Sequence, residues 1–131
     1  MNAGDDAHEC CAQWIETVSD RDLLLPVPVL TEVCQLLEKD QGPHLEAEFL
    51  RLLADSPQFK LWMPDTSSVS RMAVLVEQYA DFPLGAADSA VIAAAEQSGT
   101  HEIATLDRRH FRAVRPVHVA YFELHPSTYP G

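Results

Sequence analysis

Apolar residues recur along most of the chain at the three- and four-residue spacing of amphipathic helices. This periodicity predicts a helix over about Ala7 to Val18 and a second from Pro28 to the Gly42-Pro43 break. Further helices are expected from Leu45 to about Asp55, from the capping residues Asp65, Thr66 and Ser67 to Tyr79, and over about Ala86 to Gln97.

Short apolar runs between these helical segments predict strands at Leu23 to Pro26, Phe59 to Met63, Ile103 to Leu106 and Val117 to Leu124. A turn of helix is expected over Asp107 to Phe111. Strands that alternate with helices need crossover connections, and crossovers give parallel pairing. The expected fold class is α/β, with a mostly parallel central sheet flanked by helices on both faces.

Length and composition favour one domain. The chain has 131 residues, of which 47% are hydrophobic, enough for one core and too few for two. We expect that domain over residues 1–126, followed by a disordered Pro-rich tail over 127–131. Three cysteines without paired spacing, an acidic start and no apolar stretch of about 20 residues favour a cytoplasmic protein without membrane contact.

The net charge of −11 argues against a broad surface for nucleic acid. The basic residues are concentrated, however, because four of the nine lie at Arg108, Arg109, Arg112 and Arg115. One interpretation is a solvated helix face that offsets an acidic body. The other is an arm that contacts phosphates of a bound substrate, chiefly through Arg108, Arg109 and Arg112.

Three acids lie near the carboxyl ends of predicted strands, where parallel sheets bind their ligands. Glu32 falls in the first turn of the helix after the Leu23 strand, Asp107 directly follows the Ile103 strand, and Asp88 falls in the first turns of the alanine-rich helix. The neighbours of Asp88 at helical spacing are apolar, so its charge needs a partner. Helix dipoles also stabilise such carboxylates without any catalytic role, and this alternative stays open.

Clustered carboxylates repel each other unless a cation compensates, and oxygen ligands favour Mg²⁺ or Mn²⁺ over zinc. Such a site suits phosphodiester hydrolysis, in which Thr105 would orient water or phosphate. The six histidines are scattered without a ligand pair at helical spacing, and we interpret them as surface or core residues. Gly-rich phosphate loops and nucleophile motifs are absent from the sequence.

The chain resembles PIN domains of the VapC toxin type in three segments: Leu-Thr-Glu-Val at 30–33, Pro-Leu-Gly-Ala-Ala-Asp-Ser-Ala at 83–90 and Ala-Thr-Leu-Asp-Arg-Arg-His-Phe at 104–111. The resemblance implies a metal-dependent endoribonuclease of a toxin–antitoxin pair, inhibited by a cognate antitoxin and commonly a homodimer. It assigns Glu32, Asp88 and Asp107 to a Mg²⁺ or Mn²⁺ site, with Thr105 beside them.

One part of the family pattern has no match here. The family begins with an apolar strand that ends in Asp-Thr or Asp-Ser, whereas Met1 to Asp6 is short and polar. We therefore expect an N-terminally incomplete domain with weakened metal binding and low nuclease activity. The alternatives are a catalytically degenerate PIN module that binds an antitoxin or other protein without cleaving RNA, and a nuclease that acts on DNA.

Overall fold

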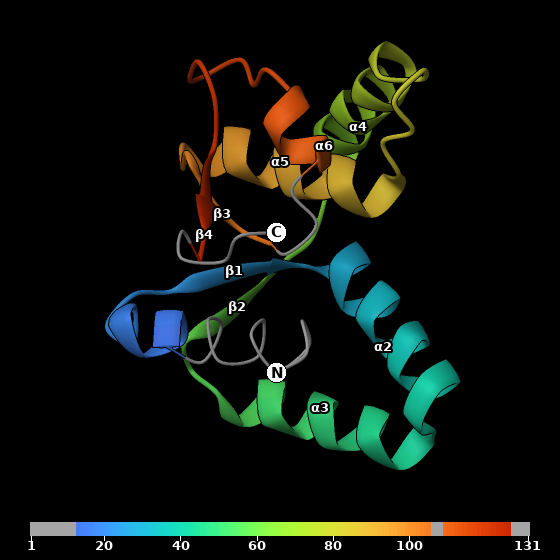
Figure 1. The fold of residues 1–131 in the computed structure, drawn as a ribbon, viewed down its shortest axis with the longest axis vertical. Coiled ribbons are helices and arrows are strands. Elements are labelled where there is room, and N and C mark those ends of the chain that lie inside the picture. Colours follow the sequence, from blue (N-terminus) through green and yellow to red (C-terminus); the bar gives the residue numbers. More distant parts are fainter. Residues whose placement is uncertain (1–12, 106–108, 127–131) are drawn as a thin grey trace, which may run out of the picture. The chain divides into compact units, whose positions relative to one another are not determined.

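The computed structural model describes residues 13–105 and 109–126, and their elements alternate between helix and strand (Figure 1). Residues 13–17 are helical. The labelled elements follow in the order β1 (Leu23–Pro26), α2 (Val27–Gln41), α3 (Pro43–Asp55), β2 (Phe59–Trp62), α4 (Thr66–Gln78), α5 (Ala86–Ser98), β3 (Glu102–Ala104), α6 (Arg109–Ala113) and β4 (Glu123–His125). The α/β fold class predicted from the sequence is confirmed.

The chain forms two compact units, each of which contains one strand pair. Residues Arg21–Ala94 form the central unit, and residues 13–20 with the described residues from Ala95 onward form the terminal unit. In the central unit β1 pairs with β2 in parallel, with Leu23 opposite Phe59. In the terminal unit β3 pairs with β4 in parallel, with Glu102 opposite Glu123. The described strands thus form two parallel pairs.

Proline and glycine set the limits of the helices in the β1–β2 crossover. Pro28 lies in the first turn of α2, where a missing amide hydrogen costs nothing. Gly42 ends the helix with φ of 90°, a conformation that side chains other than glycine rarely adopt, and its amide donates to the carbonyls of Leu37 and Glu38. Pro43 then starts α3, which packs against α2.

Helix α4 has a side-chain cap at its N-terminus. One carboxylate oxygen of Asp65 accepts hydrogen bonds from the Ser68 amide at 2.8 Å and from the hydroxyls of Ser67 and Ser68, each at 2.9 Å. These bonds satisfy a free amide of the first turn and place a negative charge at the positive end of the helix dipole. Of the three capping residues predicted from the sequence, Asp65 is confirmed as the N-cap.

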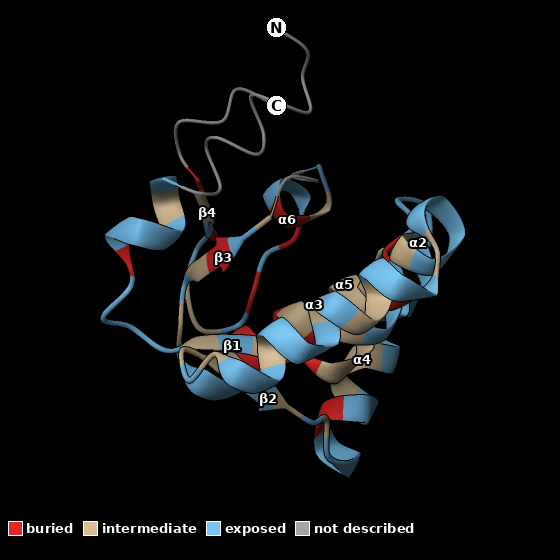
Figure 2. Ribbon diagram, turned by 90° about the horizontal axis from the view of Figure 1, so that it is seen from below, coloured by how far each residue is buried: buried red, intermediate tan, exposed pale blue. Residues whose placement is uncertain are grey.

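Each unit has its own buried residues, shown in red in Figure 2. In the central unit the side chains of Leu75 and Ile92 are fully buried, and each contributes about 1.5–3 kcal/mol to stability. Helix α5 buries a run of small residues, Ser89, Ala90, Ala93 and Ala94, so neighbouring backbone can approach closely. In the terminal unit Val114 is fully buried, with Ile103, Phe111 and Phe122 nearly so.

The strand predicted over Val117 to Leu124 was placed wrongly, because β4 covers only Glu123–His125. Hydrogen bonds that involve a side chain hold the preceding segment in a non-strand conformation. The Val117 amide donates to Glu96 Oε2 at 2.9 Å, and Nε2 of His118 bonds to the Thr100 carbonyl. The Val117 side chain is 76% exposed, so no burial favours its pairing in a sheet.

None of the helices within the described residues is long and apolar enough to cross a membrane.

Replacement of Asp65 by Ala should destabilise the protein by about 1 kcal/mol, because the α4 amide loses its acceptor. Asp65→Asn keeps a side-chain oxygen and should lose less than half of that amount. Urea unfolding followed by circular dichroism measures both differences. Equal stability of the Ala variant and the unmodified chain would contradict the capping role.

Cys34 is buried on α2, and burial raises the pKa of its thiol, with a smaller contribution from the negative charge of Glu46. The folded thiol keeps its proton where the unfolded chain has lost it. The free energy of unfolding that depends on this thiol is therefore fully retained below the unfolded-state pKa of about 8.5 and decreases as pH rises above that value.

Urea unfolding at about pH 7 and about pH 9.5 tests this dependence against a Cys34→Ala variant. The unmodified chain should lose more stability between the two pH values than the variant does. All other titrating groups are common to both proteins and cancel in the comparison. Identical losses would show that the Cys34 thiol does not titrate differently in the folded state.

Candidate active site and a histidine–glutamate cluster

Glu32 lies on α2, which follows directly from β1. The helix begins at Val27, so Glu32 falls in its second turn, and the first-turn position expected from the sequence was wrong. The prediction failed because the helix starts before Pro28. The Glu32 side chain is exposed, and its carboxylate is therefore open to solvent and to a ligand.

Asp88 lies in the first turn of α5, as the sequence predicted. Its side chain is half-buried, and the residues one and two turns further along its helix face, Ile92 and Ala95, are buried. The following residue, Ser89, is fully buried and donates its hydroxyl to the Ala86 carbonyl at 2.8 Å. Asp88 thus combines a partly desolvated carboxylate with the favourable potential of a helix N-terminus.

Thr105 directly follows β3, and its amide donates to the His125 carbonyl at 3.0 Å, which extends the β3–β4 ladder by one residue. Its side chain is half-buried. Asp107, the third predicted acid, and Arg108 lie outside the described residues.

The predicted site residues are divided between the two units. Glu32 and Asp88 belong to the central unit, whereas Thr105, Arg109 and Arg112 belong to the terminal unit. The expected meeting of these residues at one metal site therefore stays a prediction.

The arginines on and just after α6 differ in their structural roles. Phe111 and Val114 are buried, and Arg109 and Arg112 are exposed. Arg115 donates from Nη1 to the carbonyls of Arg112 at 2.9 Å and Val114 at 3.3 Å, so it caps the end of α6. Arg109 and Arg112 therefore remain the described candidates for phosphate contact, and Arg115 has a structural role.

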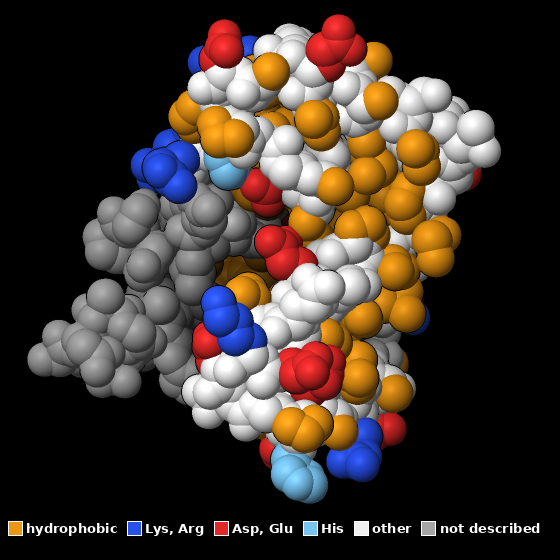
Figure 3. Space-filling model, turned by 90° about the vertical axis from the view of Figure 1, so that its right-hand side faces the viewer, with side chains coloured by type: hydrophobic (Ala, Val, Ile, Leu, Met, Phe, Trp, Pro, Cys, Tyr) orange, Lys and Arg blue, Asp and Glu red, His pale blue; other side chains and the backbone are white. Residues whose placement is uncertain are grey.

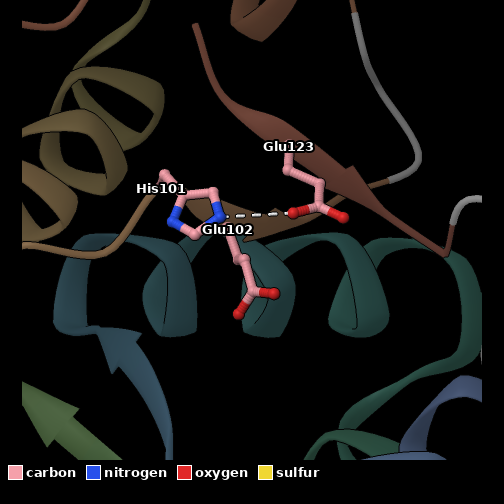
Figure 4. Close-up of side chains that lie close together, drawn as sticks. All are labelled: His101, Glu102 and Glu123. Carbon is pink, nitrogen blue, oxygen red and sulfur yellow. Dashed lines mark ion pairs between the residues drawn. The ribbon is translucent and has the colours of Figure 1, made fainter. Parts of the chain in front are cut away.

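A second group of potential ligands lies at β3 and β4. Within the described residues, His101, Glu102 and Glu123 form a group of possible metal ligands whose donor atoms all lie within 4.8 Å of one another. Figure 4 shows His101 and Glu123 facing each other, with Glu102 beside them. Nε2 of His125 lies 3.5 Å from Glu102 Oε1 and 3.8 Å from Glu123 Oε1. We call these four residues the histidine–glutamate cluster.

Reasoning from the sequence missed this cluster, because it interpreted the histidines as surface or core residues. The four residues form two short pairs, His101-Glu102 and Glu123-x-His125, that are about 20 positions apart in the chain. Only the register of β3 on β4 brings them together. The predicted strands also stopped short of His101 and His125, so neither histidine was assigned to a sheet.

The central unit exposes many large apolar side chains. Figure 3 shows hydrophobic side chains gathered over much of the face that it views. The most exposed in this unit are Leu52, Leu61 and Met63, which are 62–68% accessible. Contiguous apolar surface is a common feature of sites that bind a protein partner.

Comparison with known proteins agrees with the segments from which the resemblance was inferred. The family model of the PIN domain matches residues 1–116. Ribonuclease VapC26 of Mycobacterium tuberculosis is 30% identical over 126 residues, which cover 96% of this chain and 92% of the relative. The α/β fold with parallel strands is consistent with this match. The chain therefore belongs to the PIN-domain family, as a member of the VapC type.

Proposed function

We propose that this protein is a metal-dependent endoribonuclease, the toxin of a toxin–antitoxin pair. The observation that carries the proposal is Asp88, a half-buried carboxylate in the first turn of α5, within a chain of the VapC type. A carboxylate on an apolar helix face is costly unless it binds a cation or a donor.

The proposed metal ligands are Glu32, Asp88 and Asp107. Glu32 and Asp88 offer hard oxygen donors, which fit Mg²⁺ or Mn²⁺ better than softer metals. When bound, such an ion lowers the pKa of water and stabilises negative charge on phosphate oxygens. Thr105 would hold the substrate phosphate or a water by its hydroxyl, and the α5 N-terminus lowers the cost of the Asp88 charge.

RNA is the proposed substrate, contacted through Arg108, Arg109 and Arg112. A local positive arm allows a chain of net charge −11 to hold a polyanion, because the arm sets the potential where the phosphates bind. The exposed positions of Arg109 and Arg112 on α6 support this role.

A cognate antitoxin is the proposed protein partner, and the exposed apolar side chains of the central unit supply a surface of the kind it would cover. A homodimer would bury part of the same kind of surface. Those side chains would serve equally a PIN module that binds an antitoxin without cleaving RNA. Cleavage by the purified chain distinguishes the two functions.

Purified protein should cleave a fluorophore–quencher oligoribonucleotide in Mg²⁺ or Mn²⁺, at the low rate expected from the sequence, and excess EDTA should abolish the cleavage. Asp88→Asn should reduce the rate at least about 100-fold and Glu32→Gln about 10- to 100-fold, because each removes a charged ligand. Asp55→Asn on α3 and Glu38→Gln on α2 are matched controls that should retain activity.

The binding-module alternative predicts residual cleavage that is equal in all five proteins and insensitive to EDTA, as expected of a contaminating nuclease. An oligodeoxyribonucleotide of the same sequence tests the choice between RNA and DNA.

Reversal of Arg109 and Arg112 to Glu should weaken RNA binding roughly tenfold or more and reduce its salt dependence, because phosphate contacts are lost. Lys39 and Arg51, exposed on α2 and α3, reversed to Glu give a control with the same charge change. Fluorescence anisotropy in the Asp88→Asn background measures binding without cleavage. Equal weakening by the two pairs would mean that only net charge matters.

A further inference from the structure

Three members of the histidine–glutamate cluster lie on one face of the β3–β4 pair, and His101 directly precedes β3. Glu102 lies directly opposite Glu123 in the parallel register, and His125 lies opposite Ala104 two residues further along. Side chains two residues apart on a strand share a face, so Glu102, Glu123 and His125 project to the same side. The intervening Ile103 is buried on the other side, and the alternation places Thr105 with Ile103.

The distances in the cluster are long for hydrogen bonds. His101 Nε2 lies 3.3 Å from Glu123 Oε2, and His125 Nε2 lies 3.5 Å and 3.8 Å from the two glutamates. A charge-assisted hydrogen bond between nitrogen and oxygen spans about 2.7–2.9 Å. Two atoms each about 2.0–2.1 Å from a tetrahedral zinc ion lie about 3.3–3.4 Å apart, close to the 3.3 Å between His101 and Glu123 and the 3.5 Å between His125 and Glu102.

His125 is the second and independent sign of a ligand. Its Nε2 atom is buried and has no hydrogen-bond partner, although its side chain faces two carboxylates. The ring stacks on Trp14, with centroids 5.5 Å apart and an interplanar angle of 23°. Stacking holds the imidazole in place, and a buried ring nitrogen without a partner requires an explanation.

The charges of the cluster also favour a cation. Like charges directly opposite each other on paired strands are destabilising, and Glu102 and Glu123 form such a pair. With neutral histidines the four side chains carry a formal charge of about −2, which one divalent ion balances. Two imidazole nitrogens with two carboxylate oxygens are a donor set that suits zinc and not magnesium.

We propose that His101, Glu102, Glu123 and His125 bind one Zn²⁺ ion, at a site separate from the carboxylates of the proposed nuclease centre. The ion joins β3 to β4 and, through the ring stacked on His125, fixes Trp14 of the N-terminal helix. The role is structural, because all four donors come from the protein. The site does not depend on the ribonuclease function.

Isothermal titration of ZnCl₂ into a Cys10→Ser, Cys11→Ser, Cys34→Ala background tests the site without competing thiols. We expect one ion bound per chain, with no displacement by millimolar Mg²⁺. His125→Ala, His101→Ala and Glu123→Gln should each weaken binding roughly tenfold or more. His44→Ala on α3 and Asp88→Asn should bind zinc as the background does.

Glu123→Gln keeps the size of an exposed side chain, so it tests the site even if His125→Ala fails to fold. Co²⁺ gives a second readout in a chain that also carries Trp62→Phe, which leaves Trp14 as its tryptophan. Bound Co²⁺ should show the visible absorption of tetrahedral coordination and quench Trp14 fluorescence. Zinc binding that survives Glu123→Gln and His101→Ala unchanged, or is lost in Asp88→Asn, would overturn the proposal.

Discussion

Parallel pairing of very short strands is the constraint on which the rest of the structure depends. A parallel pair cannot be closed by a hairpin, so each strand must be followed by a crossover before its partner arrives. Helices α2 and α3 supply the crossover between β1 and β2, and α6 lies within the connection between β3 and β4. Glu32 and Thr105 therefore both follow the carboxyl ends of strands, where parallel sheets place their chemistry.

In the parallel β3–β4 pair, two different groups of polar side chains lie on opposite faces. Thr105 continues β3 on the face of buried Ile103, whereas Glu102 and Glu123 project from the opposite face. Oxygen donors beyond the strand ends suit a hard cation, and imidazoles mixed with carboxylates suit a softer one. The proposed nuclease site and the proposed zinc site therefore differ in their donor atoms.

Local sequence patterns correctly predicted the helices and strands whose limits depend on residues that are close by in the sequence. The Leu23–Pro26 strand, the Asp65 cap and the alanine-rich helix follow from apolar spacing and capping, and all three are observed. The prediction of a strand from Val117 to Leu124 failed because contacts with residues distant in the sequence determine the conformation there. Glu96 and Thr100 hold the segment at Val117 and His118 out of the sheet, and no periodicity within that segment encodes those partners.

The candidate site residues show the same difference between positions set by local sequence and positions set by long-range contacts. Asp88 was placed correctly because its helix has a clear start, whereas Glu32 lies in the second turn of α2, which begins one residue before Pro28. The histidine–glutamate cluster depends on strand register, which the sequence alone does not reveal.

The central claim is that Glu32, Asp88 and Asp107 share one cation. Paramagnetic broadening of backbone amide NMR signals by substoichiometric Mn²⁺ tests it directly, since the effect reports distance from the bound ion. The account predicts selective loss of the signals around Glu32, Asp88 and Thr105, with recovery in Asp88→Asn. Broadening that is confined to one of these segments, or that persists in Asp88→Asn, would contradict a shared site.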